Sequence, residues 1–294
     1  MEAISTHRAF GGTVGFYRHA SKATKCPMKF SVFVPERASN TTLPVLTWLS
    51  GLTCTEETFM VKSGAQRLAA EAGVILITPD TSPRGLGIEG EAKDWDFGVG
   101  AGFYVNALLP PWAENFRMQD YVTQDLQEAL FEHFPADPRR QGIFGHSMGG
   151  HGALTLGLKF PGIYKSISAF APISAPMDSP WGQKAFTGYL GEDKTTWEAF
   201  DASRIIAKVK DAKARPPILV DQGLADPFLQ VQLKPERLEE GARKSGYPLN
   251  VRRHEGYDHG YYFISTFIAD HLAHHLKILG PRAASTRASP SALE

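Results

Sequence analysis

Short apolar runs alternate with longer segments of helical periodicity along most of this 294-residue sequence. Residues 45–49 and 74–78 are apolar apart from one threonine each, which is typical of strands that are covered on both faces. In residues 119–133, apolar side chains recur at three- and four-residue steps, as they do in an amphipathic helix. Such alternation predicts an α/β fold, in which a mostly parallel central sheet carries helices on both faces. We expect one domain over residues 1–280.

Two stretches depart from this alternation. Residues 81–111 are rich in glycine, aspartate and aromatic residues and show no sustained period, and a loop of this length is usually functional. Residues 281–294 are rich in alanine, serine and proline, and we expect a flexible tail there. Elsewhere we expect further strands at residues 29–34, 142–145, 166–170, 218–220 and 249–254, and helices at residues 64–72, 119–133, 149–159 and 260–279.

The composition disfavours several classes of protein. Basic and acidic residues number 31 each, so the net charge is zero and a strongly basic surface for nucleic acid is not expected. The apolar runs are too short to span a bilayer, and the first residues lack the pattern of a signal peptide. The two cysteines, Cys26 and Cys54, are too few for a disulfide framework and suit a reducing compartment. We therefore expect a cytoplasmic protein that binds neither nucleic acid nor membrane.

The sequence Gly145-His146-Ser147-Met148-Gly149 lies between an expected strand and an expected helix. A G-x-S-x-G pattern in this context is typical of the nucleophile elbow of α/β-hydrolases. The serine of an elbow sits on a strained turn, and the flanking backbones pass so closely that glycine is required. We interpret Ser147 as a catalytic nucleophile; the alternative is a chance glycine-rich turn.

A serine hydroxyl needs a general base, and in this fold the order along the chain is serine, acid, histidine. His259 follows the last expected strand, where the fold delivers its base, whereas His254 lies within that strand. His271 and His275 form an i, i+4 pair that could bind a metal. A polar helix face near the C-terminal dipole explains these two and His274 better, because no glutamate follows His271. We predict His259 as the base and no metal site.

Two aspartates that follow the strand at residues 218–220 compete for the role of the acid. Asp221 lies at the edge of the strand and could instead accept N–H bonds from the loop backbone. Asp226 lies at the tip of the loop and could reach His259, but spacing favours it only modestly. Asp258 is the neighbour of His259, and adjacent side chains rarely face each other. The residues alone leave the choice between Asp221 and Asp226 open.

An oxyanion formed at the serine needs backbone N–H donors. In this fold one donor is the residue after the nucleophile, here Met148, and the other comes from the loop after an early strand. The strand at residues 45–49 runs into Ser50-Gly51-Leu52, so Leu52 is the natural second donor. The alternative for this segment is an ordinary glycine turn after a strand.

Several segments together resemble the S-formylglutathione hydrolase family, also known as the esterase D group. The resemblance runs from about residue 10 to about residue 279 and is far more specific than the serine motif alone. The segments that carry it are LSGLTCTE at 49–56, PDTSPRG at 79–85, WDFG at 95–98, GAGFY at 100–104, GHSMGGHG at 145–152, FAPI at 170–173, PWG at 180–182, DQG at 221–223 with Asp226, YDH at 257–259 and YYF at 261–263.

The resemblance implies roles for individual residues. It implies Ser147 as nucleophile, Asp226 as acid and His259 as base, with Leu52 and Met148 in the oxyanion hole, and so it favours Asp226 over Asp221. It also implies that Cys54 lies beside the active site without being catalytic and that Trp181 lines the substrate pocket. Where the family usually has an acidic residue, this chain has Asn106, which puts a local contact in doubt.

The function that the resemblance implies is a serine thioesterase that hydrolyses S-formylglutathione to glutathione and formate, with no cofactor. The family also suggests a homodimer. A second hypothesis keeps the triad but makes the chain a carboxylesterase for short acyl esters, or an acyltransferase similar to mycolyl transferases. A third hypothesis is a non-catalytic α/β-hydrolase fold used for binding, which the complete set of serine, histidine and aspartate argues against.

Overall fold

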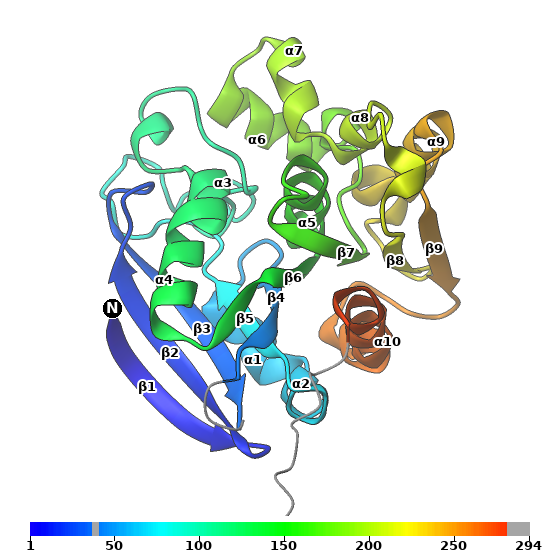
Figure 1. The fold of residues 1–294 in the computed structure, drawn as a ribbon. Coiled ribbons are helices and arrows are strands. Elements are labelled where there is room, and N and C mark those ends of the chain that lie inside the picture. The colour runs from blue at the N-terminus through cyan, green and yellow to red at the C-terminus, as the bar shows by residue number, and fades with distance from the viewer. Residues whose placement is uncertain (37–40, 281–294) are drawn as a thin grey trace, which may run out of the picture.

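The computed structural model describes residues 1–36 and 41–280, which form one mixed sheet of nine strands flanked by helices (Figure 1). The expected tail at residues 281–294 lies outside the described residues. Across the sheet the strand order is β1-β2-β3-β5-β4-β6-β7-β8-β9. The strands are β1 (Glu2–Ala9), β2 (Gly12–Ala20), β3 (Pro27–Pro35), β4 (Leu43–Leu49), β5 (Ile75–Pro79), β6 (Ala136–His146), β7 (Tyr164–Phe170), β8 (Ile218–Gly223) and β9 (Leu249–His254).

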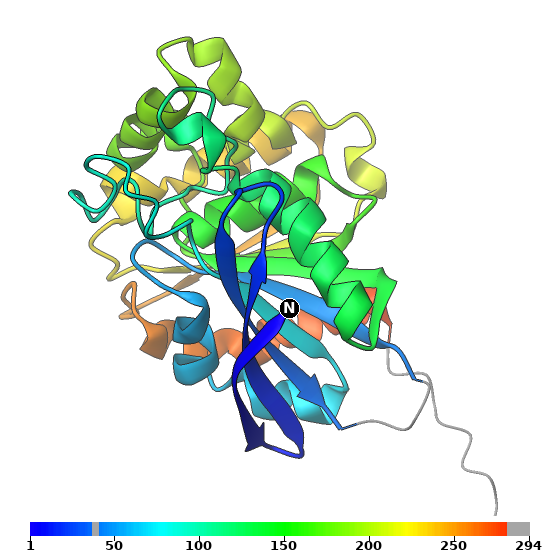
Figure 2. The ribbon, with the colours of Figure 1, turned by 90° about the vertical axis from the view of Figure 1, so that its left-hand side faces the viewer.

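The sheet is parallel from β5 to β9, as the sequence predicts. The neighbouring pairs β5–β4, β4–β6, β6–β7, β7–β8 and β8–β9 all run parallel. The pairs β1–β2, β2–β3 and β3–β5 are antiparallel. The hairpin of β1 and β2 forms one outer edge of the sheet (Figure 2), and no sequence pattern described above predicts it.

Helices cover both faces of the sheet, which confirms the predicted α/β class. In Figure 1, α1, α2 and α10 lie on one face, and α4 and α5 lie on the other. No helix of the described residues is long and apolar enough to cross a membrane. The helices are α1 (Glu56–Lys62), α2 (Ala65–Ala72), α3 (Met118–Asp120), α4 (Leu126–His133), α5 (Met148–Lys159), α6 (Pro180–Leu190), α7 (Lys194–Trp197), α8 (Ala202–Ile206), α9 (Pro235–Ser245) and α10 (Tyr261–Leu279); a π-helical turn, η2 (Tyr121–Asp125), joins α3 to α4.

The carboxyl ends of the parallel strands are aligned, and this brings distant loops together. Leu49 at the end of β4 pairs with Gly145 of β6, and His146 pairs with Phe170 at the end of β7. Phe170 also pairs with Asp221 of β8. The segments that follow β4, β6, β8 and β9 therefore start at one edge of the sheet, where open α/β folds bind their ligands. These segments carry Leu52, Ser147, Asp226 and His259.

Aromatic packing fixes both ends of the loop that follows β4. Trp48 of β4 stacks on Phe59 of α1 with ring centroids 4.2 Å apart, and it meets the edge of Phe144 of β6 at 4.9 Å. All three side chains are fully buried. Aromatic pairs of this geometry contribute roughly 0.5–1.5 kcal/mol beyond their buried area. The cluster therefore ties α1 to the central strands, and residues 50–55 between them are anchored on both sides.

The expectation that His271 and His275 form a polar helix face is wrong, because both rings are fully buried against the sheet. The two ring nitrogens of His275 lie 2.6 Å from the Ser166 hydroxyl and 2.9 Å from the Ser168 hydroxyl. Nδ1 of His271 lies 2.8 Å from the same Ser168 hydroxyl. Serines of β7 thus supply the hydrogen bonds that allow polar rings of α10 to face inward.

Buried neutral histidines should make the stability of this fold depend on pH. Burial lowers the pKa of His151 to about 4, and it lowers the pKa of His275 well below its ordinary value. The unfolded chain binds a proton on each ring as the pH falls through about 6.5, whereas the native state does not. The free energy of unfolding should therefore decrease as the pH falls from about 6.5 towards 4.

Urea denaturation of His151→Gln and wild type at several pH values tests this expectation. The variant should show a pH dependence that is weaker by up to about 1.4 kcal/mol per pH unit in this range. His7→Gln, which changes an exposed histidine, is the control and should keep the wild-type dependence. Equal dependence in all three proteins would contradict the assignment of His151 as a buried neutral group.

Candidate active site

Ser147 occupies the sharp turn between β6 and α5, with φ 58° and ψ −119°. This left-handed φ is uncommon for a residue other than glycine, so the turn is strained. Its N–H donates to the Phe170 carbonyl at 3.0 Å, and its carbonyl accepts from the His151 N–H at 3.0 Å. A Cβ on Gly149 would lie 1.9 Å from the carbonyl oxygen of Leu49, which explains the glycine there. These features are those of a nucleophile elbow.

The Ser147 side chain is not used as a helix cap. Serine is a common N-cap residue, yet this hydroxyl makes no capping hydrogen bond to α5. The N–H of Met148 is the first of the helix and has no acceptor within it. A negative charge that formed next to Ser147 would therefore meet this first-turn N–H and the positive end of the helix dipole.

The loop after β4 packs directly against the elbow. Gly51 lies so close that a Cβ there would be 3.2 Å from Cβ of Ser147. On either side of the half-buried Leu52, the Gly51 carbonyl accepts from the Cys54 N–H at 3.3 Å, and the Thr53 N–H donates to a carbonyl of another loop. Among the described residues, the Leu52 N–H itself donates to no protein group. The structure thus brings the predicted second oxyanion donor beside the predicted nucleophile.

Asp226 and His259 form a direct pair across two loops. Nδ1 of His259 donates to a carboxylate oxygen of Asp226 at 2.6 Å, which leaves Nε2 as the proton acceptor of the neutral ring. Asp226 is buried, and it also accepts from the Phe228 N–H at 2.8 Å and from the Gln222 amide at 3.3 Å. The carboxylate is therefore fixed in position and holds the histidine in one tautomer.

Asp221, the other candidate acid, has different partners. Its carboxylate accepts from the Arg252 guanidinium at 2.7 and 2.6 Å and lies 3.2 Å from Nε2 of His271. Burial would raise the pKa of Asp221, but the hydrogen bonds from His271 and Arg252 outweigh burial and lower it well below its usual range. Asp258 instead accepts from the Gly260 N–H at 2.8 Å. Of the three aspartates, Asp226 is the one that contacts His259.

His146 is a residue of this site that the sequence analysis gives no role. Its ring centroid lies 4.4 Å from that of His259, and the side chain is buried. Burial lowers the pKa of His146 well below its ordinary value, and the neighbouring His259 lowers it further. His146 is therefore a neutral ring beside His259. Its position directly before Ser147 in the G-x-S-x-G motif is the sequence feature that indicates a place in the site.

Cys54 and Trp181 are the two residues that the resemblance places beside the active site. Burial raises the pKa of the Cys54 thiol, while a hydrogen bond with Thr58 opposes that rise. Trp181 is buried at the start of α6, and its ring centroid lies 4.8 Å from that of Phe228. Phe228 in turn meets the edge of His259 at 5.0 Å. Trp181 therefore reaches the triad through Phe228.

Asn106 makes the local contact that an acidic residue could also make. Its side-chain oxygen accepts from the backbone N–H of Asp120 at 3.1 Å, in the short helix α3. An asparagine at this position thus supplies the acceptor without the charge that an acidic residue would carry. In the described part of the chain, no group of three or more histidine, cysteine or carboxylate side chains could hold a metal ion.

Comparisons with known proteins identify the family of this chain. The Esterase family model matches residues 21–274. The chain is 51% identical to the S-formylglutathione hydrolase of Mus musculus over 280 residues, covering 95% of this chain and 99% of the relative. It is also 51% identical to the S-formylglutathione hydrolase of Arabidopsis thaliana over 281 residues, covering 95% and 98%. A solved structure of an S-formylglutathione hydrolase from Agrobacterium tumefaciens superposes with a TM-score of 0.91 at 46% identity, covering 95% of this chain and all of that one. This chain therefore belongs to the S-formylglutathione hydrolase family.

Proposed function

We propose that this chain hydrolyses S-formylglutathione to glutathione and formate, with Ser147, His259 and Asp226 as its catalytic triad. The observation that carries the proposal is the 2.6 Å hydrogen bond between His259 and Asp226, at the same sheet edge as the strained Ser147. The substrate is taken from the printed names of the relatives. The His259–Asp226 pair and the elbow conformation of Ser147 support the assignment of these three residues.

The first half of the reaction transfers the formyl group to the enzyme. The Ser147 oxygen attacks the thioester carbonyl while Nε2 of His259 takes the hydroxyl proton. The carbonyl oxygen becomes an oxyanion that the N–H groups of Leu52 and Met148 stabilise. The C–S bond then breaks, and His259 gives its proton to the departing glutathione sulfur. Asp226 holds the ring in the required tautomer and stabilises its cation.

The second half repeats these steps with water. His259 takes a proton from a water molecule, and the resulting hydroxide attacks the formyl ester on Ser147. The same two N–H groups stabilise the second oxyanion. The ester bond breaks, His259 returns its proton to the Ser147 oxygen, and formic acid leaves and releases a proton to water to become formate. One water is consumed per thioester, and the enzyme returns to its starting state without any cofactor.

We also propose that this reaction takes place in the cytoplasm. Cys26 and Cys54 are both free thiols in the structure, which supports a reducing compartment such as the cytoplasm. We retain the homodimer as a proposal that rests on the family resemblance. The proposed substrate is a small molecule, and the balanced net charge gives no support for a nucleic-acid partner.

Ser147→Ala removes the proposed nucleophile and should lower kcat/KM by about four orders of magnitude or more, because a triad without its nucleophile loses covalent catalysis. The measurement is hydrolysis of S-formylglutathione by purified variant and wild type, with circular dichroism to confirm that both fold. Ser245→Ala, at the end of α9, is the control and should retain full activity. Wild-type turnover by Ser147→Ala would show that the mechanism is wrong.

Acyl chain length should separate the thioesterase from a general carboxylesterase. Formyl is the smallest acyl group, so we expect each added methylene on glutathione thioesters and aryl esters to lower kcat/KM. S-formylglutathione should also be a better substrate than an aryl acetate. Faster hydrolysis of butyryl than of formyl or acetyl groups would favour the carboxylesterase hypothesis.

Alkylation should distinguish a thiol near the site from a catalytic one. Iodoacetamide should inactivate the wild type slowly at pH 7 and faster towards pH 9, because burial raises the pKa of Cys54 and the thiolate is the reactive form. Cys54→Ala should retain most activity and become resistant, whereas Cys26→Ala should remain sensitive. If Cys54→Ala is itself inactive, the thiol has a role that the proposed mechanism omits.

A further inference from the structure

Tyr104 holds the start of loop 50–54 from inside the protein. Its hydroxyl donates to the Ser50 carbonyl at 2.9 Å, and the side chain is only 1% exposed, so it is shielded from a bound substrate. The ring fills the space beside Gly152 of α5, where a Cβ would lie 2.5 Å from it. The Ser50 carbonyl is thus positioned relative to α5, the helix that begins next to Ser147.

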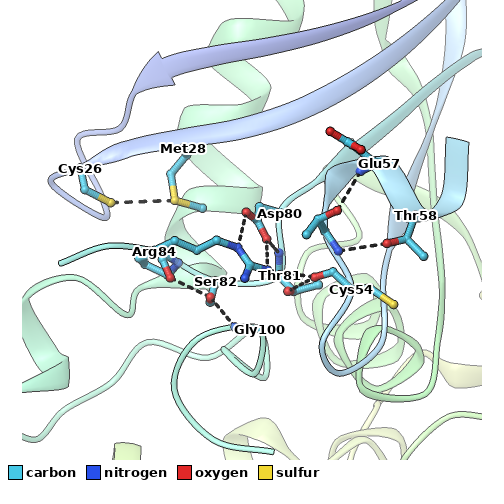
Figure 3. A network of polar contacts seen from close by, with 12 residues as sticks. Cys26, Met28, Cys54, Glu57, Thr58, Asp80, Thr81, Ser82, Arg84 and Gly100 are labelled. Atoms are coloured by element: carbon cyan, nitrogen blue, oxygen red, sulfur yellow. Dashed lines mark hydrogen bonds and ion pairs between the residues drawn. The ribbon is translucent and has the colours of Figure 1, made fainter. Parts of the chain in front are cut away.

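Thr81 and Arg84 hold the end of the same loop at the Cys54 carbonyl (Figure 3). The Thr81 hydroxyl donates to this carbonyl at 2.6 Å, and the Arg84 guanidinium donates to it at 3.1 Å. Both donors are fixed by the buried carboxylate of Asp80, which accepts from Arg84 at 2.7 and 2.8 Å and from the Thr81 N–H at 2.7 Å. Charge-assisted bonds of this kind restrict the geometry strongly.

Three residues in loop 50–54 and in residues 80–104 have strained backbone conformations. Thr53 has φ 67°, Phe103 has φ 48° and Tyr104 has φ 53°. The Thr53 N–H donates to the Gly100 carbonyl at 2.9 Å, and Nε2 of His151 donates to the Phe103 carbonyl at 2.9 Å. Residues in such conformations persist only where their surroundings hold them, and they cluster at functional sites.

We propose that residues 80–104 form a clamp that sets the direction of the Leu52 N–H, with Tyr104 and Thr81 as positioning residues. The proposal rests on the function proposed above, in which this N–H stabilises the oxyanion. The clamp holds the carbonyl two residues before Leu52 and the carbonyl two residues after it. A donor that is already oriented does not have to reorganise as charge develops on the substrate. Loss of one clamp bond should therefore slow turnover without weakening substrate binding.

Tyr104→Phe and Thr81→Val each remove one clamp bond and leave the shape of the side chain nearly unchanged. Tyr164→Phe is the matched control, because Tyr164 is a buried tyrosine at the start of β7 whose hydroxyl bonds to the Gln127 amide at 3.5 Å. For each variant we would measure the melting temperature, and kcat and KM for S-formylglutathione per titrated active site. The inhibition constant of a trifluoromethyl ketone, which forms an oxyanion on Ser147, gives an independent readout.

We expect kcat to fall about 10- to 100-fold in Tyr104→Phe and Thr81→Val, less than the loss of a whole oxyanion donor, with KM within about twofold of wild type. The inhibition constant should rise by a similar factor, while Tyr164→Phe changes only the melting temperature. The clamp is overturned if both variants match Tyr164→Phe in kcat per active site, or if KM rises at unchanged kcat. Activity in Ser147→Ala would instead reject the proposed function, which keeps the two failures distinct.

Discussion

The backbone strain at Ser147 is the constraint on which the site depends. A residue in this region of φ and ψ costs roughly 1–3 kcal/mol and needs surroundings that hold it. Here the Ser147 N–H donates to the Phe170 carbonyl and the Ser147 carbonyl accepts from the His151 N–H, so the backbone is held on both sides of the residue. The glycines at 145 and 149 permit this, since a Cβ on either would lie within 2.3 Å of a backbone oxygen. The elbow is thus stabilised by the register of β4, β6 and β7.

Asp221 and Asp226 lie close together in sequence but have different partners. Asp221 has a structural role, and Asp226 contacts the proposed catalytic histidine. Asp221 is inside β8 and pairs with Arg252 of β9, so its charge joins neighbouring strands. Asp226 is past the strand end, where the N–H of Phe228 and the ring of His259 are its partners. The Asp221–Arg252 pair thus joins β8 to β9 just before the loop that carries Asp226.

Patterns local in sequence predict the parallel strands, the elbow and the loop positions of Leu52 and His259. Such local patterns do not predict features that depend on residues far away in the chain. His271 and His275 look like a polar helix face, and their burial is explained by distant partners: the serines of β7, more than 100 positions away, and Asp221 of β8 beside His271. The choice between Asp221 and Asp226 depends on Arg252, which a different strand supplies. The β1–β2 hairpin has little signal in the sequence, because β1 is an edge strand whose side chains are mostly exposed and show no alternating apolar pattern.

The neutral ring of His146 completes the electrostatic account of the proposed mechanism. When His259 takes the Ser147 proton it becomes a cation. The energy barrier of this step depends on the charges around the ring. A protonated His146, with its ring 4.4 Å away, would repel that cation. Because burial keeps the pKa of His146 well below its ordinary value, the developing charge meets the Asp226 carboxylate and no second cation. The variable position of the G-x-S-x-G motif thus contributes by remaining uncharged.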